Sequence, residues 1–393
     1  MVCSPDCNTD PMPVPLDEFP VHQVPMSMAH VASTDRNAYD RSYFNVGNRT
    51  DEVFLVTGLG VYPNLGVIDA YACARVGDRQ HTVAYSDALG DDRLDQRVGG
   101  YTVEVIEPLR RIRLICEGAP GSDDAASAAP RFDLTWTGSF PAIEEQPHLF
   151  RVGPKMILQA CRFAQVGTWE GTLEVGGRSW AVDPDTWLGS RDRSWGIRPV
   201  GEPEPPGRAA AESPADYGFW WTYVPLRFDD FAVVVIVQED GHGHRLLNDA
   251  VRVWPDGRDP ELLGWPRVEI DRRSGSREAV AARLHLTLPD GAPARIDVEP
   301  GLGVALSMGA GYGSDPAWSH GTWQGRDWTH AAIVDLADAA TSTMLPFSMV
   351  DHHARAVWHG DDHDGAEGWG LFEHLSIGAH APSGFTDYGS VAP

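Results

Sequence analysis

Short apolar runs and alternating apolar and polar positions extend along most of the chain, and continuous stretches with helical spacing are scarce. Residues 53–57 read as a buried strand, and residues 231–237 are apolar enough to be buried on both faces of a sheet. Residues 101–106 and 111–116 alternate apolar with polar side chains around a short turn, which is the period of a half-buried hairpin. The pattern therefore predicts an all-β fold.

Turn signals separate further pairs of predicted strands. Gly176-Gly177 lies between residues 171–175 and 178–182, and Asp290-Gly291 lies in the loop between residues 284–288 and 295–299. Both dipeptides favour tight turns that join antiparallel strands. The 30 prolines and 41 glycines are also typical of many strands joined by turns.

A chain of 393 residues is long enough for two domains. Residues 1–30 are rich in proline and methionine and predict an extended arm. We expect one β domain at residues 31–185 and a second at residues 186–393, each a barrel or sandwich, with an apolar chamber between or within them. Residues 202–215, rich in proline, alanine and glycine, predict an exposed excursion.

The formal net charge of -25 disfavours nucleic acid and anionic membranes as partners. No apolar run approaches the roughly 20 residues that span a bilayer, and the first ten residues lack a secretion signal. Five cysteines without repeated spacing form neither a disulfide framework nor a zinc cluster. These features predict a cytoplasmic protein, and a homo-oligomer is compatible with them.

The segment at residues 185–198 combines a carboxylate, three arginines and two tryptophans. If Trp187 and Trp195 wall a cavity, burial would raise the pKa of Asp192 so that it could hold or deliver a proton. The positive charges of Arg191 and Arg198 would instead lower the pKa of Asp192. The alternative is a structural Asp–Arg pair beneath tryptophans.

A second cluster, at residues 309–325, is rich in glycine and aromatic residues. Tyr312, Trp318, His320 and Trp323 offer flat surfaces with polar tips, which suit a pocket wall or an aromatic plug at the end of a barrel. The glycine spacing is not that of a dinucleotide-binding or P-loop motif.

A third cluster, at residues 351–374, is rich in histidine and carboxylate residues. This density would suit a zinc or non-haem metal site, but the spacing argues against one, and we assign no metal. Glu373 and His374 lie in a strand-like run, so one of the two should face inward. The aromatic strand at residues 219–224 adds Trp221 and Tyr223 as candidates for the pocket.

Residues 189–196, Gly-Ser-Arg-Asp-Arg-Ser-Trp-Gly, resemble a motif of the carotenoid 1,2-hydratases (hydroxyneurosporene synthases) and the wider AttH-like, lipocalin-like proteins. The resemblance implies a lipocalin-like fold and a role for Asp192 as proton donor to an isolated alkene. Trp187 lies near the family's upstream aromatic residue. Ser190 and Ser194 stand where the family has tyrosine and asparagine.

The residues and the resemblance together predict two lipocalin-like β-barrel or sandwich domains and a cofactor-free acid–base enzyme. Its partner would be a hydrophobic small molecule (a terpenoid, steroid or aromatic alkene) that it hydrates, dehydrates, isomerises or cyclises. The predicted catalytic residues are Asp192, Arg191, Glu373 and His320. The predicted substrate-binding residues are Trp187, Trp195, Trp221, Tyr223, Tyr312, Trp318, Trp323 and His374.

Two alternatives remain open at this stage. A lipocalin-like cavity can carry a lipid or terpenoid without changing it, and an Asp192 locked by an arginine would favour that use. A metal-dependent enzyme is the other, or a glycoside-cleaving one in which Asp192 and Glu373 face each other across a polar groove.

Overall fold

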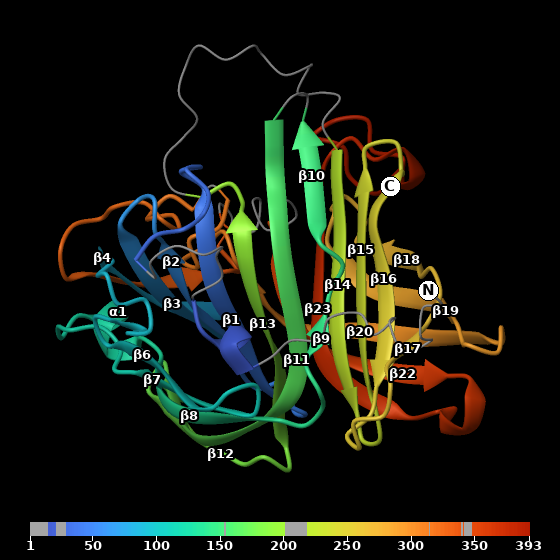
Figure 1. The fold of residues 1–393 in the computed structure, drawn as a ribbon, viewed down its shortest axis with the longest axis horizontal. Helices are drawn as coiled ribbons and strands as arrows, with labels where there is room; N and C mark the ends of the chain where they lie inside the picture. The colour runs from blue at the N-terminus through green and yellow to red at the C-terminus, as the bar shows by residue number, and fades with distance from the viewer. Residues whose placement is uncertain are drawn as a thin grey trace, which may run out of the picture.

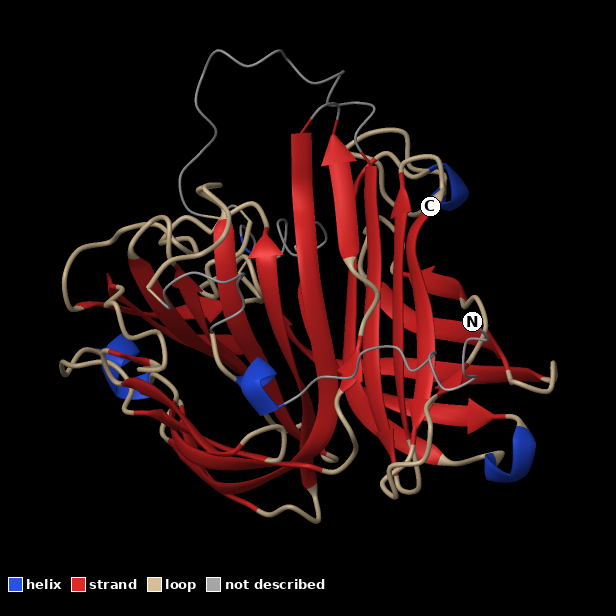
Figure 2. Cartoon of the chain, in the orientation of Figure 1, coloured by secondary structure: helices blue, strands red, loops and turns tan. Residues whose placement is uncertain are grey.

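The chain folds into two curled antiparallel sheets that lie side by side (Figures 1 and 2). The computed structural model describes residues 15–20, 29–152, 155–200, 218–313, 315–338, 341 and 348–393. The all-β prediction is confirmed, and each sheet is a half-barrel of the lipocalin-like type. The predicted excursion at 202–215 and most of the predicted arm lie outside the described residues.

The first sheet contains 14 strands, in the order β21-β4-β3-β2-β1-β13-β11-β8-β7-β6-β5, with β9, β10 and β12 paired to β11. Its strands are β1 (Ala38–Asn48), β2 (Phe54–Tyr62), β3 (Val67–Val76), β4 (Arg79–Ala88), β5 (Arg97–Val98), β6 (Tyr101–Glu107), β7 (Arg111–Cys116), β8 (Arg131–Gly138), β9 (Ile143–Glu144), β10 (His148–Val152), β11 (Lys155–Val175), β12 (Arg178–Val182), β13 (Trp187–Ile197) and β21 (Trp328–Asp335).

The second sheet contains 9 strands, in the order β17-β16-β15-β14-β23-β22-β20-β19-β18. These are β14 (Gly218–Phe228), β15 (Ala232–Asp240), β16 (Arg245–Val253), β17 (Glu261–Leu262), β18 (Arg267–Arg272), β19 (Ala279–Thr287), β20 (Pro293–Ala305), β22 (Val350–His359) and β23 (Glu367–Gly378). The described helices are short: α1 (Asp124–Ala128) and 3-10 turns at Pro15–Glu18, Asp361–His363 and Ala381–Ser383.

Sheet membership differs in two places from the predicted division at residues 185 and 186. Strand β13 pairs with β1 and β11 in the first sheet, and β21, which follows much of the second sheet in sequence, pairs with β4. The chain thus crosses back to the first sheet after β20. The division into domains stays a prediction.

The predicted hairpins are confirmed. Strands β6 and β7 pair with each other, β11 and β12 pair around Gly176-Gly177, and β19 and β20 pair around the loop that contains Asp290-Gly291. Within the described part of the chain, no helix combines the length and apolar character that a membrane crossing requires.

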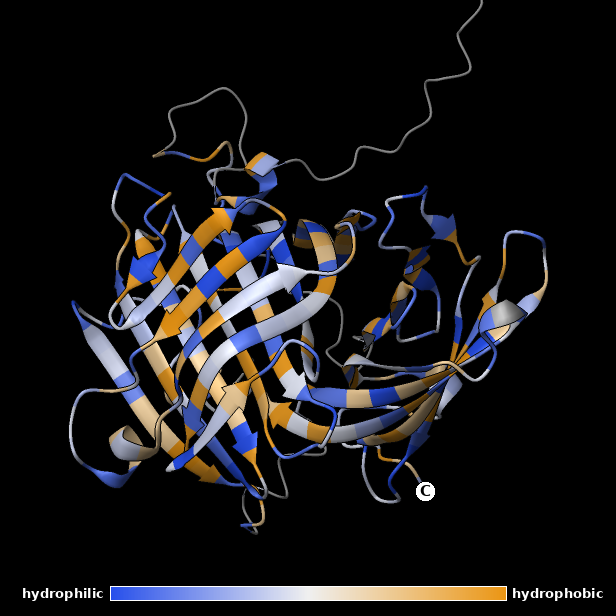
Figure 3. Cartoon of the chain, turned by 90° about the horizontal axis from the view of Figure 1, so that it is seen from below, coloured by the Kyte–Doolittle hydropathy of each residue, from blue (hydrophilic) through white to orange (hydrophobic). Residues whose placement is uncertain are grey.

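Hydrophobic side chains form three main cores. One lies within the first sheet and includes Trp136 and Trp169, and another lies within the second sheet and includes Trp358. The third joins the two sheets, with residues such as Tyr43 from β1 and Trp221 from β14. Figure 3 shows the corresponding alternation of apolar and polar bands along the strands. Each sheet therefore buries one face internally and part of the other against its neighbour.

Polar contacts also fix one sheet against the other. Gln80 Nε2 donates to the carbonyl oxygens of Ala305 (2.9 Å) and Met308 (2.6 Å), and His353 Nε2 lies 2.8 Å from the carbonyl oxygen of Asn48. Since these groups are buried, losing one partner would leave the other unpaired at a cost of about 1–3 kcal/mol. Buried hydrogen bonds thus fix the position of one sheet relative to the other.

Gly189 permits β13 to approach β1 closely. A Cβ atom at this position would lie 1.9 Å from the carbonyl oxygen of Asn45, which also accepts a hydrogen bond from Trp169 Nε1 (2.9 Å). A side chain here would therefore have to push the two central strands of the first sheet apart.

We expect Gly189→Ala to lower the free energy of unfolding by about 1–3 kcal/mol, because the added methyl group overpacks a buried strand pair. Gly90→Ala is the matched control, since a Cβ at this exposed glycine meets nothing within 4 Å. Urea unfolding of both variants measures the difference. Equal stabilities for the two variants would contradict the close approach.

Candidate active site

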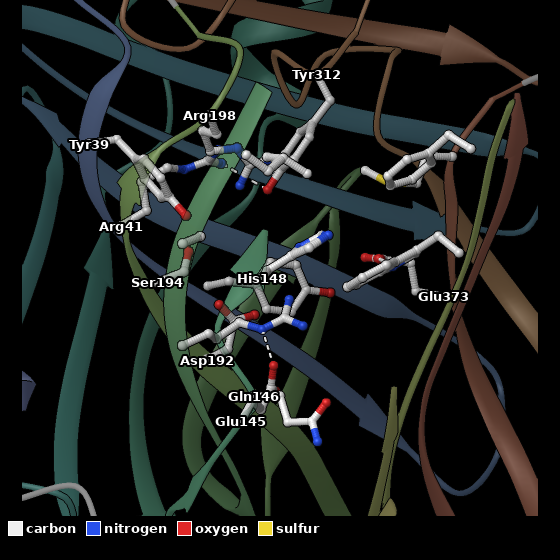
Figure 4. A pocket seen from close by; sticks show the side chains of 17 residues that line it. Tyr39, Arg41, Glu145, Gln146, His148, Asp192, Ser194, Arg198, Tyr312 and Glu373 are labelled. Carbon is white, nitrogen blue, oxygen red and sulfur yellow. Dashed lines mark hydrogen bonds and ion pairs between the residues drawn. The ribbon is translucent and has the colours of Figure 1, made fainter. Parts of the chain in front are cut away.

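A cavity of about 130 Å³ lies between the two sheets (Figure 4). Strands β1, β11 and β13 of the first sheet supply one wall, and β14 and β23 of the second supply the other. Its polar and aromatic lining residues are Tyr39, Arg41, Tyr43, Glu145, Gln146, His148, Arg162, Asp192, Ser194, Arg198, Phe219, Trp221, Tyr312 and Glu373.

Strand alternation decides which residues of β13 reach the cavity. Asp192 and Ser194 point into it, whereas Arg191 and Arg193 point to the opposite face. There, Arg191 Nη1 lies 2.6 Å from Glu18 Oε1, so this predicted catalytic residue is a buried structural cation away from the cavity. Arg193 is likewise buried and pairs with a carboxylate.

Asp192 is the acid that the cavity leaves unpaired. Its side chain is buried, and among the described residues none makes a hydrogen bond or ion pair with its carboxyl group. Burial raises the pKa of Asp192 to about 6, against the opposing charges of Arg162, Arg41 and Arg198. Neither Arg191 nor Arg198 forms an ion pair with Asp192. The Asp–Arg pair that would have favoured a carrier of an unchanged ligand is therefore not observed.

Arg162 of β11 and Glu145 form a buried ion pair beside Asp192, with 2.5 Å between Nε and Oε2. The guanidinium group also packs on the ring of Tyr223, at 4.4 Å from the centroid. Burial raises the pKa of Glu145 to about 7, although Arg162 opposes the shift. Arg162 is thus held by partners of its own and leaves Asp192 without a direct contact.

The opposite wall is aromatic. His148 stacks on Trp221 with 5.3 Å between ring centroids and an interplanar angle of 11°, and its Nε2 contacts Gln238 Oε1. Burial and, after it, Arg162 lower the pKa of His148 to about 4, so this ring is neutral at pH 7. Trp221 Nε1 donates to Glu373 Oε1, which fixes that carboxylate at the cavity edge.

Glu373 has a second acid beside it. Asp351 is its cross-strand partner between β22 and β23, and Tyr43 Oη donates to Asp351 Oδ2 at 2.5 Å. Asp351 Oδ1 is buried and has no hydrogen-bond partner among the described residues. Burial, followed by the charge of Glu373, raises the pKa of Asp351 well above its usual range. The two carboxyl groups thus lie side by side, and the folded state favours the protonated form of Asp351.

The side chain of Arg41, on β1, reaches the cavity, and its hydrogen-bond partners are not carboxylates. Its Nη2 donates to Tyr312 Oη (2.8 Å) and to His320 Nε2 (2.9 Å), and His320 Nδ1 lies 3.1 Å from Asp69 Oδ1. Since Nε2 accepts, the Nδ1 proton must donate to Asp69. Burial and then Arg41 lower the pKa of His320 to about 4. His320 thus lies behind Arg41 and orients it.

The predicted site residues divide into three groups. Asp192, Glu373, Trp221 and Tyr312 line the cavity. Tyr223 and His320 contact lining residues from behind. The remaining predicted residues lie elsewhere: Arg191, Trp187, Trp195, Trp318, Trp323 and His374.

The positions of this last group have simple physical reasons. Trp187 belongs to the core of the first sheet, and Trp195 packs on Phe163 on the face of β13 opposite Asp192. Trp318 is buried behind the cavity and donates to the carbonyl oxygen of Gly309 at 3.2 Å. Trp323 is 50% exposed.

His374 follows Glu373 in β23 and so faces the other way. Its Nδ1 lies 2.8 Å from the carbonyl oxygen of Trp221, and its ring packs on Trp220. The expectation that one of the two neighbours faces inward is met by Glu373. The acid and the histidine therefore belong to different environments.

Sequence reasoning missed Arg41, Arg162, His148 and Glu145. Two features of the sequence could have indicated the two arginines. One face of β1 carries Tyr39, Arg41 and Tyr43 at alternate positions, and an apolar stretch of β11 is interrupted by Arg162. An arginine within a buried strand usually marks a paired or ligand-facing cation.

The histidines between residues 351 and 374 do not gather at one site, because they lie on both faces of their strands. His352 Nδ1 lies 3.0 Å from the carbonyl oxygen of Gly301, and His353 stacks on Phe54. Across the described ranges, no group of three His, Cys, Asp or Glu residues could hold a metal ion.

The fold and the cavity define a two-sheet, lipocalin-like β protein with an internal cavity lined by carboxyl groups, arginines and aromatic rings. The model of a family of unknown function (DUF8625) matches residues 14–386, so the chain belongs to this family. That match gives no sequence-level support for the resemblance to carotenoid 1,2-hydratases. No curated protein matches the chain.

Solved structures resemble the fold. Kievitone hydratase from Nectria haematococca has a TM-score of 0.51 at 14% identity, with 93% of each chain covered. CghA with Sch210972 has a TM-score of 0.49 at 12% identity, covering 93% of this chain and 95% of the other. Another structure of CghA has a TM-score of 0.47 at 12% identity, covering 87% and 89%. The likeness to kievitone hydratase shows a shared fold.

We expect Asp351→Asn to raise the stability of the protein at pH 7 to 8. The folded state raises the pKa of Asp351, so the wild type loses stability as pH rises from the unfolded pKa toward the folded one. The asparagine amide needs no proton, can donate to Glu373, and can accept from Tyr43. Thermal unfolding between about pH 4 and 8 should show an advantage that grows with pH.

Asp185→Asn, at an exposed carboxylate, is the control for this series. Its stability should follow that of the wild type at each pH. An Asp351→Asn variant that is less stable than the wild type at pH 8 would contradict a raised pKa of Asp351 in the folded protein.

Proposed function

We propose that this protein is a cofactor-free acid–base enzyme that acts on a carbon–carbon double bond of a hydrophobic small molecule, as a hydratase, dehydratase, isomerase or cyclase. Asp192 is the general acid. The observation that carries this proposal is a buried, unpaired carboxyl group in a cavity wall, with a pKa raised to about 6. A general acid works best when its pKa lies near the operating pH.

In the hydration direction, Asp192 gives its proton to one alkene carbon, and the other carbon becomes cationic. The new Asp192 carboxylate then faces that cation in a site of low dielectric constant, where attraction is strong. The rings of His148 and Phe219 lie near-parallel to Trp221, and Trp187 and Trp195 lie away from the cavity. Carboxylates are therefore assigned the main part in stabilising the developing charge.

Glu373 is suited to accept the proton of the attacking water. It lies on the wall opposite β13, Trp221 Nε1 donates to it, and Asp351 is its cross-strand neighbour. Water adds its oxygen to the cationic carbon and gives a proton to Glu373. Solvent then returns a proton to Asp192 and takes one from Glu373, so the net reaction adds one water. Dehydration is the reverse.

The fold shared with kievitone hydratase makes kievitone a reasonable first compound to test, beside terpenoid, steroid and other aromatic alkenes. Incubation in D₂O separates the reaction types by mass spectrometry. Hydration adds one D₂O, isomerisation by proton transfer introduces carbon-bound deuterium without adding a water molecule, and cyclisation without proton transfer leaves carbon-bound hydrogen unexchanged.

We expect Asp192→Asn to lower turnover by at least about 10²-fold, because the amide cannot donate a proton to carbon. Product formation with the best compound of the panel is the measurement, and Asp185→Asn is the matched control at an exposed position. A fully active Asp192→Asn variant would remove the acid assignment. Binding without product for every compound would favour a carrier.

We also expect kcat/KM to fall about tenfold per pH unit above about pH 6, since the acid must be protonated and Asp192 has a pKa of about 6. A pH–rate profile of the wild type measures this. An activity that rises between about pH 6 and 8 would instead assign a base to the limiting step.

A further inference from the structure

We propose that the end of the cavity formed by Arg41, Arg198 and Tyr312 binds an ionised oxygen group, so that the substrate is a hydrophobic carboxylate or an ionised enol or phenol. This inference rests on the proposed function because it names the substrate class of the same cavity. Figure 4 shows the three residues at one end, with Asp192 and Glu373 on other parts of the wall.

Arg41 carries a buried charge without an anionic partner in contact. Its side chain is 5% exposed, and both hydrogen-bond partners of Nη2, Tyr312 Oη and His320 Nε2, are neutral. Asp69 lies beyond His320. Nη1 is buried and has no partner among the described residues. An arginine remains charged in proteins, so this unmade hydrogen bond is costly until a ligand supplies an acceptor.

Arg198 supplies a second positive charge at the same end. Its guanidinium group packs on the rings of Tyr39 (5.4 Å) and Tyr312 (5.7 Å), the same tyrosine that Arg41 contacts at 4.8 Å. In the part of the chain that the structure describes, no carboxylate pairs with the Arg198 side chain.

Neighbouring arginines provide the contrast. Arg162, Arg191 and Arg193 are each buried beside a carboxylate within 3.2 Å. Within the described ranges, Arg41 and Arg198 have no such partner, although both lie close enough to Asp192 to lower its pKa. The cavity thus has a positive end that no described carboxylate pairs with. A ligand oxyanion would supply the missing acceptor.

The surrounding carboxyl groups favour a ligand with a single negative charge. Asp192, Glu145 and Glu373 line the rest of the cavity, and Asp192 and Glu145 become negative above their pKa values of about 6 and 7, which disfavours a phosphate dianion. A planar, delocalised oxyanion matches the guanidinium fork and can lie against the tyrosine rings. With its anionic group at Arg41 and Arg198, the apolar body of the ligand extends toward the acid.

The test compares 2-naphthoate with its neutral isostere 2-naphthamide by isothermal titration calorimetry at about pH 8, where the carboxylate is ionised. We expect the wild type to bind the anion at least about tenfold more tightly, which corresponds to roughly 1.4 kcal/mol. Arg198→Gln should reduce the preference to about threefold or less, and Arg198→Lys should retain most of it. Arg326→Gln, at an exposed arginine, is the control and should keep the full preference.

Asp192→Asn separates this inference from the proposed function. It should keep or increase the preference for 2-naphthoate because it removes a nearby negative charge, whereas it should lose turnover. Equal binding of the two probes by the wild type, no binding of 2-naphthoate, or an Arg198→Gln variant with the full preference would each overturn the anion site. An active Asp192→Asn variant that prefers the anion would contradict the acid assignment alone.

Discussion

Desolvation between two packed sheets is the constraint on which the rest of the site depends. Apolar side chains of β1, β2 and β3 meet those of β14, β15 and β16 in a shared core, and the cavity lies at the edge of this core. Water is therefore largely excluded from the carboxyl groups that face it. Burial is the largest cause of the raised pKa values of Asp192, Glu145 and Asp351. The acid–base character of the site follows from the packing.

The same packing sorts the charged residues into two kinds. Buried arginines with carboxylate partners, such as Arg191 with Glu18, tie segments of the first sheet together. Arg41 and Arg198 face the cavity without a carboxylate partner, and Asp192 faces it without a hydrogen bond, as far as the described residues go. Arg41 Nη1 and Glu145 Oε1, both on residues that line the cavity, are among the buried side-chain atoms without a hydrogen-bond partner in the described part of the chain. The cavity thus contains polar atoms that a ligand could pair with.

Much of the fold was predictable from local pattern, because strand period and turn chemistry act over a few residues. The hairpins around Gly176-Gly177 and the loop of Asp290-Gly291 follow directly from sequence. The unusual composition around Asp192 was also visible. The return of β21 to the first sheet and the contact of His320 with Arg41 join residues more than 200 positions apart, which no local pattern encodes. Side chains alternate along a strand, so only one of two neighbours such as Arg191 and Asp192 points into the cavity, and the sequence alone does not show which.

The most direct measurement is the pKa of Asp192 itself. Carbon-13 NMR of protein labelled at the aspartate carboxyl carbon, with Asp192→Asn used to assign the resonance, follows its titration. The account predicts a midpoint of about 6. A midpoint near 4, the ordinary value for an aspartate, would show that the carboxyl group is solvated and would contradict the central claim.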